Sequence, residues 1–416
     1  MKEKQLIPII AGMIGSRVSA NQGAENAGKI LYVGSDGRVK PAFSFTPVYE
    51  SISQIAETVR RNTVSANKAL FPVGDQIITP WVDLDDPNHA TAATAYQVAW
   101  DIVHHASVEL ENGSEVPGMF LQMHKCSTYG VQYSHQQAFF QAFSEALPAG
   151  TYNVSFGVKY NNTFTAGTTG QFTLTQNLPI GGKLLLNGSK VEAWASATVA
   201  SATESVDLTV GTEGTSLGSI TSNSARSSDD LNAMHRIQNG HSRWSTSGIR
   251  QYLNAAGTGW FSSKEDFDIR PNEYAKHGFM AGFNSDFLGA IKPIKITTAL
   301  NTVEDFESDT EDTFDTFFLP SIQQMNVTPQ LANVEGDAFD YWKQALNSES
   351  FVGTGSSNVF DAFKIPAISN DSTHNVRLRS DYRGNAHHTW LVNSSGYVSF
   401  SDARYAYHFS PVCVIC

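Results

Sequence analysis

Short stretches with an apolar residue at every second position, each followed by a turn rich in Gly, Asn or Ser, recur along most of this 416-residue chain. Alternation with period two is typical of strands that bury one face, whereas an amphipathic helix needs a period near 3.6. Residues 96–103 show the pattern, and residues 116–123 are predicted to form another strand after the Asn112-Gly113 turn. The chain is therefore predicted to fold as a β-rich α+β protein.

Four short segments favour helices instead: residues 50–67, 244–254, 286–288 and 340–343. In the first of them, Ile52, Ile55 and Val59 have the spacing of one helical face. Other segments predict a strand pair around residues 28–39 and a run of strands at 150–158, 170–175, 183–186 and 206–210. That run has the spacing of a β-sandwich and is predicted to form a module of its own.

Composition narrows the class of protein. Charged residues make up only 16% of the chain, whereas Phe and Tyr are abundant, so the surface must be polar but largely neutral, as in β-rich secreted or virion proteins. The formal net charge of -12 argues against nucleic acid, because a phosphate backbone needs clustered Lys and Arg. No segment is long and apolar enough to predict membrane insertion. Residues 1–20 resemble a signal peptide only weakly, since the apolar run contains Pro8 and is followed by Arg17.

Six segments, in order along the chain, resemble one family. They are residues 71–75 (FPVGD), 244–254 (WSTSGIRQYLN), 315–321 (DTFFLPS), 377–380 (RLRS), 390–396 (WLVNSSG) and 411–415 (PVCVI). Together they resemble phage and Firmicute proteins of the DUF6273 type. The resemblance implies a C-type lectin-like scaffold, which formylglycine-generating enzymes share with variable proteins diversified by retroelements.

The resemblance implies a division of the chain into four segments. Residues 1–65 would be an N-terminal virion-attachment and oligomerisation segment, since the hairpin around residues 28–39 resembles the start of phage head-fibre proteins. Residues 66–132 would be the first part of the C-type lectin-like domain, and residues 226–416 the remainder with a C-terminal ligand-binding face. Residues 133–225 would be a β-sandwich inserted between them.

The ligand-binding face is predicted from the last forty residues. In such a scaffold two C-terminal strands are held by buried apolar anchors, here Leu378, Trp390, Val392, Val398, Phe409 and Val412. Residues 381–388 and 399–408 lie between the anchors and are expected to face solvent. The predicted ligand-binding residues are Asp381, Tyr382, Arg383, Asn385, His387, His388, Ser399, Ser401, Asp402, Arg404, Tyr405, Tyr407 and His408.

The residue types on this face are typical of a binding surface. Tyr supplies rigid contact area, and Ser, Asn, Asp, His and Arg supply adaptable hydrogen bonds, as in antibody loops. The same set resembles what adenine-directed mutagenesis of Asn codons produces, as in retroelement-diversified proteins. Surface loops of any β protein are also rich in Ser, Asn and Tyr, so ordinary loops are the alternative interpretation.

No catalytic residue is predicted. The formylglycine-generating relatives need a pair of activated thiols, but Cys413 and Cys416 are three residues apart in a terminal strand and are expected on opposite faces. Cys126 is far away in sequence and is expected to be a buried apolar residue. The chain is accordingly predicted not to be an enzyme, with a formylglycine-generating-like oxidase as a remote alternative.

No metal site or cofactor is predicted either. Each of the pairs His104-His105 and His387-His388 is expected to place its two side chains on opposite faces of a strand. The carboxylates of residues 304–315 could hold Ca²⁺, yet the spacing of an EF-hand is missing, and a solvated acidic loop explains them as well.

These features predict a bacteriophage protein displayed on the virion, as a head fibre, a capsid decoration or part of the tail. The N-terminal segment would bind a capsid or tail protein, and the C-terminal face would bind a bacterial surface glycan or protein or an environmental ligand. Multivalent display favours a homo-oligomer, and a trimer is expected. The alternative is a secreted or surface adhesin of a bacterium with the same fold.

Overall fold

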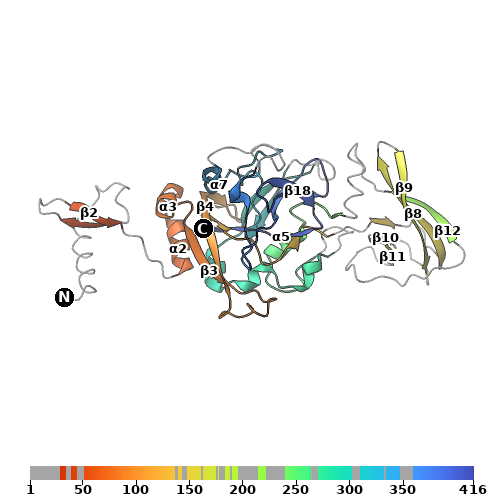
Figure 1. Cartoon of the computed structure of the whole chain (residues 1–416), viewed down its shortest axis with the longest axis horizontal. Helices are drawn as coiled ribbons and strands as arrows, with labels where there is room; N and C mark the ends of the chain where they lie inside the picture. Colours follow the sequence, from red (N-terminus) through yellow and green to blue (C-terminus); the bar gives the residue numbers. More distant parts are fainter. Residues whose placement is uncertain are drawn as a thin grey trace. The chain divides into compact units, whose positions relative to one another are not determined.

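The computed structural model describes residues 29–33, 39–44, 51–135, 139–142, 148–160, 163–174, 177, 183–187, 190–194, 214–221, 239–262, 264, 270–301, 310–331, 334–346 and 359–416. The chain divides into two compact units, Met1–Ile55 and Ala56–Cys416. Short helices accompany several antiparallel sheets (Figure 1), so the prediction of a β-rich α+β protein is confirmed. No described helix is long and apolar enough to cross a membrane.

The first unit contains the predicted hairpin. Strand β1 (Lys29–Val33) pairs with β2 (Val39–Ser44) in antiparallel fashion, and the register shifts once between Ile30 and Leu31. The weak signal-peptide resemblance of residues 1–20 lies outside the described residues.

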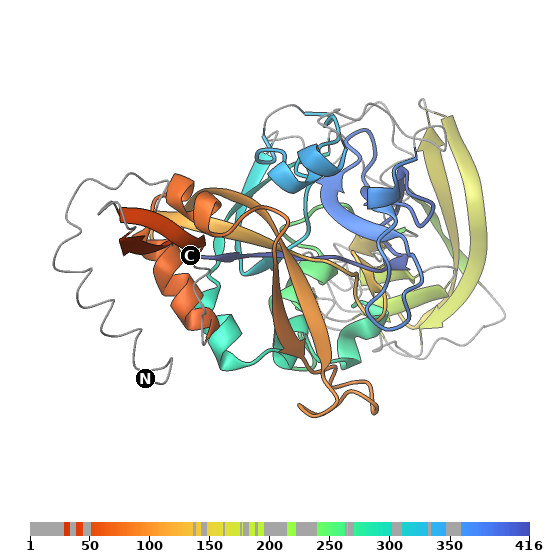
Figure 2. The same cartoon turned by 60° about the vertical axis from the view of Figure 1, so that its left-hand side comes forward.

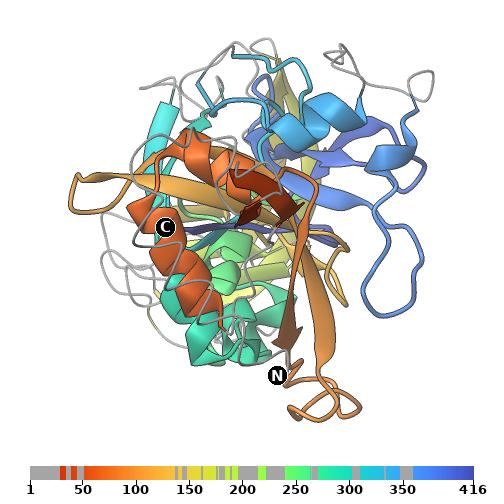
Figure 3. The same cartoon turned by 90° about the vertical axis from the view of Figure 1, so that its left-hand side faces the viewer.

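The predicted helix at residues 50–67 is in fact two helices, α2 (Ile52–Arg61) and α3 (Val64–Leu70), shown in orange in Figure 3. The break falls at Thr63, whose side chain accepts a hydrogen bond from the backbone N–H of Ala66 at 3.2 Å and so caps the second helix. Beyond the break the buried residue of α3 is the polar Asn67, whose side-chain amide donates to the carbonyl oxygen of Val59 at 2.8 Å. Helix α3 packs against β4 (Tyr96–Glu109).

The largest sheet has five strands in the order β15 (Phe317–Phe318), β20 (Val412–Ile415), β5 (Glu115–Met123), β4 and β3 (Gln76–Trp81), all antiparallel. Val412 lies opposite Gln122 and Ile415 opposite Met119, so the C-terminal strand, dark blue in Figure 2, lies beside a strand from the first third of the chain. Every residue of β20 is buried, as expected for a strand covered on both faces.

Smaller sheets accompany the five-stranded one. Strand β13 (Ile294–Ala299) pairs with β14 (Thr310–Asp315), and β6 (Val131–Gln132) pairs with β19 (Ala406–Tyr407). A three-stranded sheet consists of β16 (Val376–Asp381), β17 (His388–Val392) and β18 (Val398–Asp402). The three predicted short helices are present as α5 (Gly248–Leu253), α6 (Ser285–Ala290) and α7 (Asp340–Ala345). Short 3-10 helices are η3 (Asn272–Ala275), η4 (Phe279–Gly282) and η5 (Asp361–Phe363).

Buried aromatic side chains fill the space next to the large sheet. Trp100 on β4 lies 5.3 Å from Phe287 and 6.0 Å from Phe317 between ring centroids, and Phe279 lies 5.2 Å from Phe317. All six predicted anchors, Leu378, Trp390, Val392, Val398, Phe409 and Val412, are buried, which confirms that part of the prediction. The core therefore joins the C-terminal strands to those of residues 76–123.

Between residues 139 and 221 the described strands form two three-stranded sheets. One has the order β11 (Lys190–Trp194), β10 (Lys183–Asn187), β7 (Phe139–Ala142), and the other β12 (Gly214–Thr221), β8 (Gly150–Tyr160), β9 (Thr163–Leu174). The strands predicted at 150–158, 170–175 and 183–186 are present, and the one predicted at 206–210 lies outside the described residues. Strand β12 runs parallel to β8, a pairing that no hairpin pattern could indicate.

Candidate functional site

A tight turn sets the register of the C-terminal sheet. Strands β17 and β18 are joined at Asn393 to Tyr397, where the side chain of Asn393 accepts a hydrogen bond from the N–H of Ser395 at 2.8 Å. Gly396 has φ of 90°, a conformation that favours glycine, and a Cβ there would lie 2.6 Å from the carbonyl oxygen of Phe360. The turn therefore requires glycine, and it places His388 opposite Asp402 and Trp390 opposite Phe400.

The predicted ligand-binding residues of this sheet do not share one surface. Side chains alternate along a strand, so His388 and Asp402 project on one side, while Thr389 and Ser401 project on the other. The prediction that residues 399–408 form one continuous face is therefore wrong for strand β18. The side that carries His388 and Phe400 is called the aromatic side, and the side that carries Thr389 and Ser401 is called the arginine side, after Arg377.

The aromatic side is built on Tyr382, which follows strand β16. Its ring centroid lies 4.3 Å from that of Phe400 and 5.3 Å from that of Trp390. The His388 ring lies 5.0 Å from Phe400 and 6.2 Å from Tyr382. Tyr382, His388 and Phe400 are half-buried and Trp390 is buried, so this side offers an aromatic platform with partly accessible ring edges.

The arginine side is organised by Arg377, a fully buried residue of β16. Its guanidinium donates to the hydroxyl of Thr389 at 2.7 Å and to four carbonyl oxygens, those of Thr389 at 3.5 Å, Ser401 at 3.0 Å, Asp402 at 2.8 Å and Tyr405 at 3.2 Å. Burial lowers the pKa of Arg377 to about 10, so the side chain remains protonated at neutral pH. Arg377 therefore fixes the backbone of residues 401–405.

Tyr407 and Tyr405 complete this side. The Arg377 guanidinium lies 4.6 Å from the ring centroid of Tyr407, whose hydroxyl is 3.1 Å from that of Ser401. Tyr405 is 45% exposed, and its hydroxyl accepts a hydrogen bond from Arg404 at 3.2 Å. Arg377 lies in one of the segments that resemble the DUF6273 type, but the sequence did not predict its structural role. The one indication was its position next to the buried anchor Leu378.

Several predicted residues are not solvent-facing. Asp381 is 3% exposed and His387 is 2% exposed, and Ala386 and Ala403 are also buried, so the expectation that the stretches 381–388 and 399–408 face solvent is wrong at these positions. An earlier segment of the chain covers this stretch: the backbone N–H of Ser242 donates a hydrogen bond to the carbonyl oxygen of Ala386 at 3.1 Å.

The remaining predicted residues lie around these two sides. The backbone N–H of Arg383 donates to the side chain of Gln330 at 2.7 Å, and that of Asn385 donates to the carbonyl of Tyr382 at 2.9 Å. Ser399 is half-buried opposite Leu391. His408 stacks on His374 with ring centroids 3.8 Å apart, and burial lowers its pKa. His408 therefore belongs to the packing beside the sheet.

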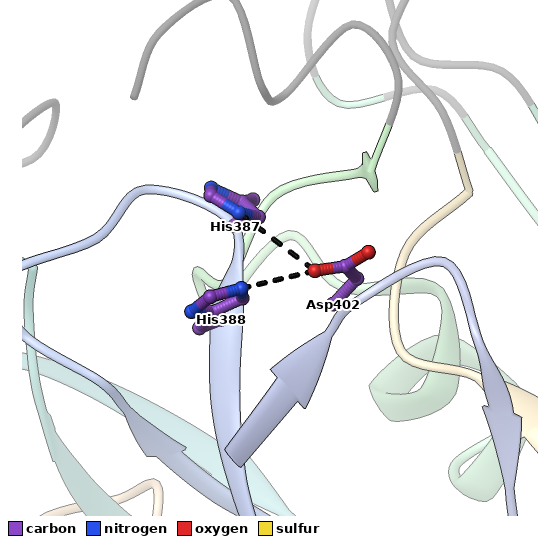
Figure 4. A group of neighbouring side chains, drawn as sticks. All are labelled: His387, His388 and Asp402. Carbon is purple, nitrogen blue, oxygen red and sulfur yellow. Dashed lines mark hydrogen bonds and ion pairs between the residues drawn. The ribbon is translucent and has the colours of Figure 1, made fainter. Parts of the chain in front are cut away.

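Three of the predicted residues converge on one point (Figure 4). Nε2 of His388 lies 3.0 Å from Oδ1 of Asp402, and Nε2 of His387 lies 3.7 Å from the same oxygen. The expectation that His387 and His388 point to opposite faces of a strand is wrong, because β17 begins at His388 and His387 precedes the pleat. Burial raises the pKa of Asp402, but the hydrogen bond with His388 and the nearby His387 and Arg404 outweigh it and lower the pKa overall.

The other histidine pair behaves differently. His104 Nδ1 lies 3.4 Å from Oδ2 of Asp340, whereas His105 Nε2 lies 2.8 Å from the carbonyl oxygen of Phe71. Burial lowers the pKa of both histidines. The two rings therefore contact different partners, as expected for neighbouring residues of one strand, whose side chains point to opposite faces.

The three cysteines are all free and buried. Burial raises the pKa of Cys126 to about 12 and that of Cys416 to about 11, and it raises that of Cys413 well above its ordinary value. A thiol must lose its proton to act as a nucleophile or a metal ligand. At neutral pH these environments hold all three thiols protonated.

The acidic segment is partly a strand. Residues 310–315 form β14, so the predicted loop is wrong there, while residues 302–309 lie outside the described residues. The Glu311 carboxylate accepts hydrogen bonds from Arg243 at 2.9 Å and Ser245 at 2.8 Å. The Asp315 carboxylate accepts from Arg250 at 2.6 Å and from the indole of Trp244 at 3.0 Å. These carboxylates hold the 243–250 segment onto β14.

Comparison with known families gives a match over the C-terminal half of the chain. The family described as "Domain of unknown function (DUF6273)" matches residues 218–415, so the chain contains a DUF6273 domain that includes the whole C-terminal sheet. No curated protein and no solved structure matches the chain.

Proposed function

We propose that this chain is a bacteriophage virion protein with a C-type lectin-like domain, which binds a host-cell or environmental ligand through its C-terminal sheet. The observation that carries the proposal is the arrangement of this sheet, where a stable scaffold supports partly exposed aromatic and polar side chains. Tyr405 is the most exposed of these aromatics, at 45%. Exposed Tyr next to Arg is a combination enriched at protein binding sites.

Three features support the lectin-like part of the proposal. The DUF6273 domain spans the sheet, and β20 pairs with β5, so the end of the domain closes on strands from before residue 132. The buried Arg377 holds the 401–405 backbone in place while Tyr405 stays exposed. A binding loop held by a buried network loses little conformational entropy when it meets a ligand.

The proposal is tested with the purified full chain and with phage particles. We expect Tyr405→Ala to reduce binding to host cells at least tenfold while leaving thermal unfolding unchanged. The matched control is Tyr341→Ala, which removes a half-buried tyrosine of α7. Equal binding by Tyr405→Ala and wild type would contradict a ligand contact at this residue.

Location is tested separately. Antibody-labelled electron microscopy is expected to place the protein on the surface of the particle. Labelling of bacterial cells in the absence of any particle would contradict the virion assignment and favour a secreted adhesin. The N-terminal unit is proposed to attach to a capsid or tail protein, and deletion of residues 1–50 is expected to abolish incorporation into particles.

A further inference from the structure

The convergence of His387, His388 and Asp402 differs from the other histidine–carboxylate contacts of the described residues. His124 pairs with Asp101 at 2.8 Å and His277 with Asp85 at 3.0 Å, and in each case a single imidazole meets the carboxylate. At Asp402 two imidazoles meet the same oxygen, and the three ligand atoms all lie within 4.8 Å of one another. Two imidazoles around one carboxylate are a ligand set that divalent transition metals prefer.

The distances suit a small metal ion. A tetrahedral zinc ion with bonds of about 2.0–2.1 Å needs ligand atoms about 3.3–3.4 Å apart. The two nitrogen–oxygen distances, 3.0 Å and 3.7 Å, lie on either side of that value. One ring nitrogen of each histidine and one Asp402 oxygen all lie within 4.8 Å of one another, so closure around zinc requires a movement of about 1.5 Å or less.

The surrounding contacts hold the ligands in place. His387 is buried, its ring centroid lies 4.0 Å from that of His388, and the His388 ring also packs on Phe400. Oδ1 of Asp402 faces the histidines, while Oδ2 lies 3.7 Å from Nε of Arg404. A charged partner on the second oxygen orients a carboxylate ligand, as outer contacts do in metal sites.

We propose that His387, His388 and Asp402 bind one divalent transition-metal ion, zinc most readily, through Nε2 of the two histidines and Oδ1 of the aspartate. Three protein ligands leave at least one coordination position for water or for an atom of an external ligand. The side chains of His388 and Asp402 are each 19% exposed, so this position is reachable from solvent. This inference does not depend on the proposed function, because zinc binding by the purified chain can be measured without any cell or phage particle.

The test uses the full chain, purified without a histidine tag and treated with a chelator. Zinc chloride is titrated by calorimetry, bound zinc is counted by elemental analysis, and cobalt is added as a spectroscopic probe of tetrahedral coordination. We expect one zinc per chain and a visible cobalt absorption. Asp402→Asn and His388→Gln should each weaken zinc binding at least about 100-fold and abolish the cobalt absorption.

His124→Gln is the matched control, since it removes a histidine that pairs with an aspartate but, among the residues that the structure describes, has no third ligand. It should bind zinc as the wild type does. The proposal is overturned if the wild type binds no zinc, or if Asp402→Asn binds it equally, which would place the ion elsewhere. Circular dichroism checks that each variant is folded. Both replaced side chains are partly exposed, and if one variant unfolds, zinc binding by the other variant tests the proposal.

Discussion

Arg377→Met tests whether a single buried guanidinium holds the ligand-binding sheet together. The substitution keeps most of the side-chain volume but removes the donors to the carbonyls of Ser401, Asp402 and Tyr405. A buried acceptor left without its partner costs about 1–3 kcal/mol. Water can reach part of this region, because Ser401 and Asp402 are half-buried, so the lower end applies to each carbonyl. The expected loss in the free energy of unfolding is about 3–5 kcal/mol.

Guanidinium denaturation followed by tryptophan fluorescence measures this loss, and calorimetry should show the corresponding fall in Tm, roughly 4–7 °C for a unit of the size of Ala56–Cys416. The control is Arg404→Met, whose side chain is one-third exposed and bonds to the exposed Tyr405. Its expected loss is under about 1 kcal/mol. Equal stability of the two variants would refute the assignment of Arg377 as the organiser of residues 401–405.

Three further predictions follow from burial and backbone geometry. Burial, and to a lesser extent the charge of Arg404, lowers the pKa of His135 to about 4. In the unfolded chain the histidine pKa is about 6.5, so the unfolded state takes up the proton first and the free energy of unfolding should fall as pH drops from about 6.5 to 4. Denaturant titrations should show a flatter dependence on pH for His135→Gln. Gly396→Ala should lower the free energy of unfolding by at least about 1 kcal/mol, measured by the same titration, because the turn has positive φ and no room for a Cβ; an unchanged midpoint would contradict the turn geometry. A thiol-specific reagent should modify no cysteine of the native protein and all three in denaturant, because each thiol is buried; rapid native reaction of Cys413 or Cys416 would instead favour thiol chemistry.

The secondary structure and the buried anchors of the C-terminal sheet could be predicted from the sequence. Period-two alternation identified the strand that begins at residue 96, and the Asn112-Gly113 turn marked the start of the next strand. The buried anchors on the C-terminal strands followed from the family resemblance and from their apolar character. These features are local, so a single sequence expresses them.

Long-range contacts could not be obtained in the same way. The burial of His387 and Asp381 depends on coverage by residues near 242, and the parallel pairing of β12 with β8 depends on a distant partner. The convergence of His387 and His388 on Asp402 depends on where β17 begins, at His388. His387 lies outside the strand, so its side chain does not follow the alternation of strand residues.

The most direct test of the proposed function measures the binding of the purified full chain to bacterial host cells, comparing wild type with Tyr405→Ala and Tyr341→Ala at equal protein concentration. The proposal predicts saturable binding by the wild type and the Tyr341→Ala control, and at least tenfold weaker binding by Tyr405→Ala, with the same thermal unfolding for Tyr405→Ala as for the wild type. Binding that survives unchanged in Tyr405→Ala, or is lost equally in both variants, would contradict a ligand-binding role for the C-terminal sheet.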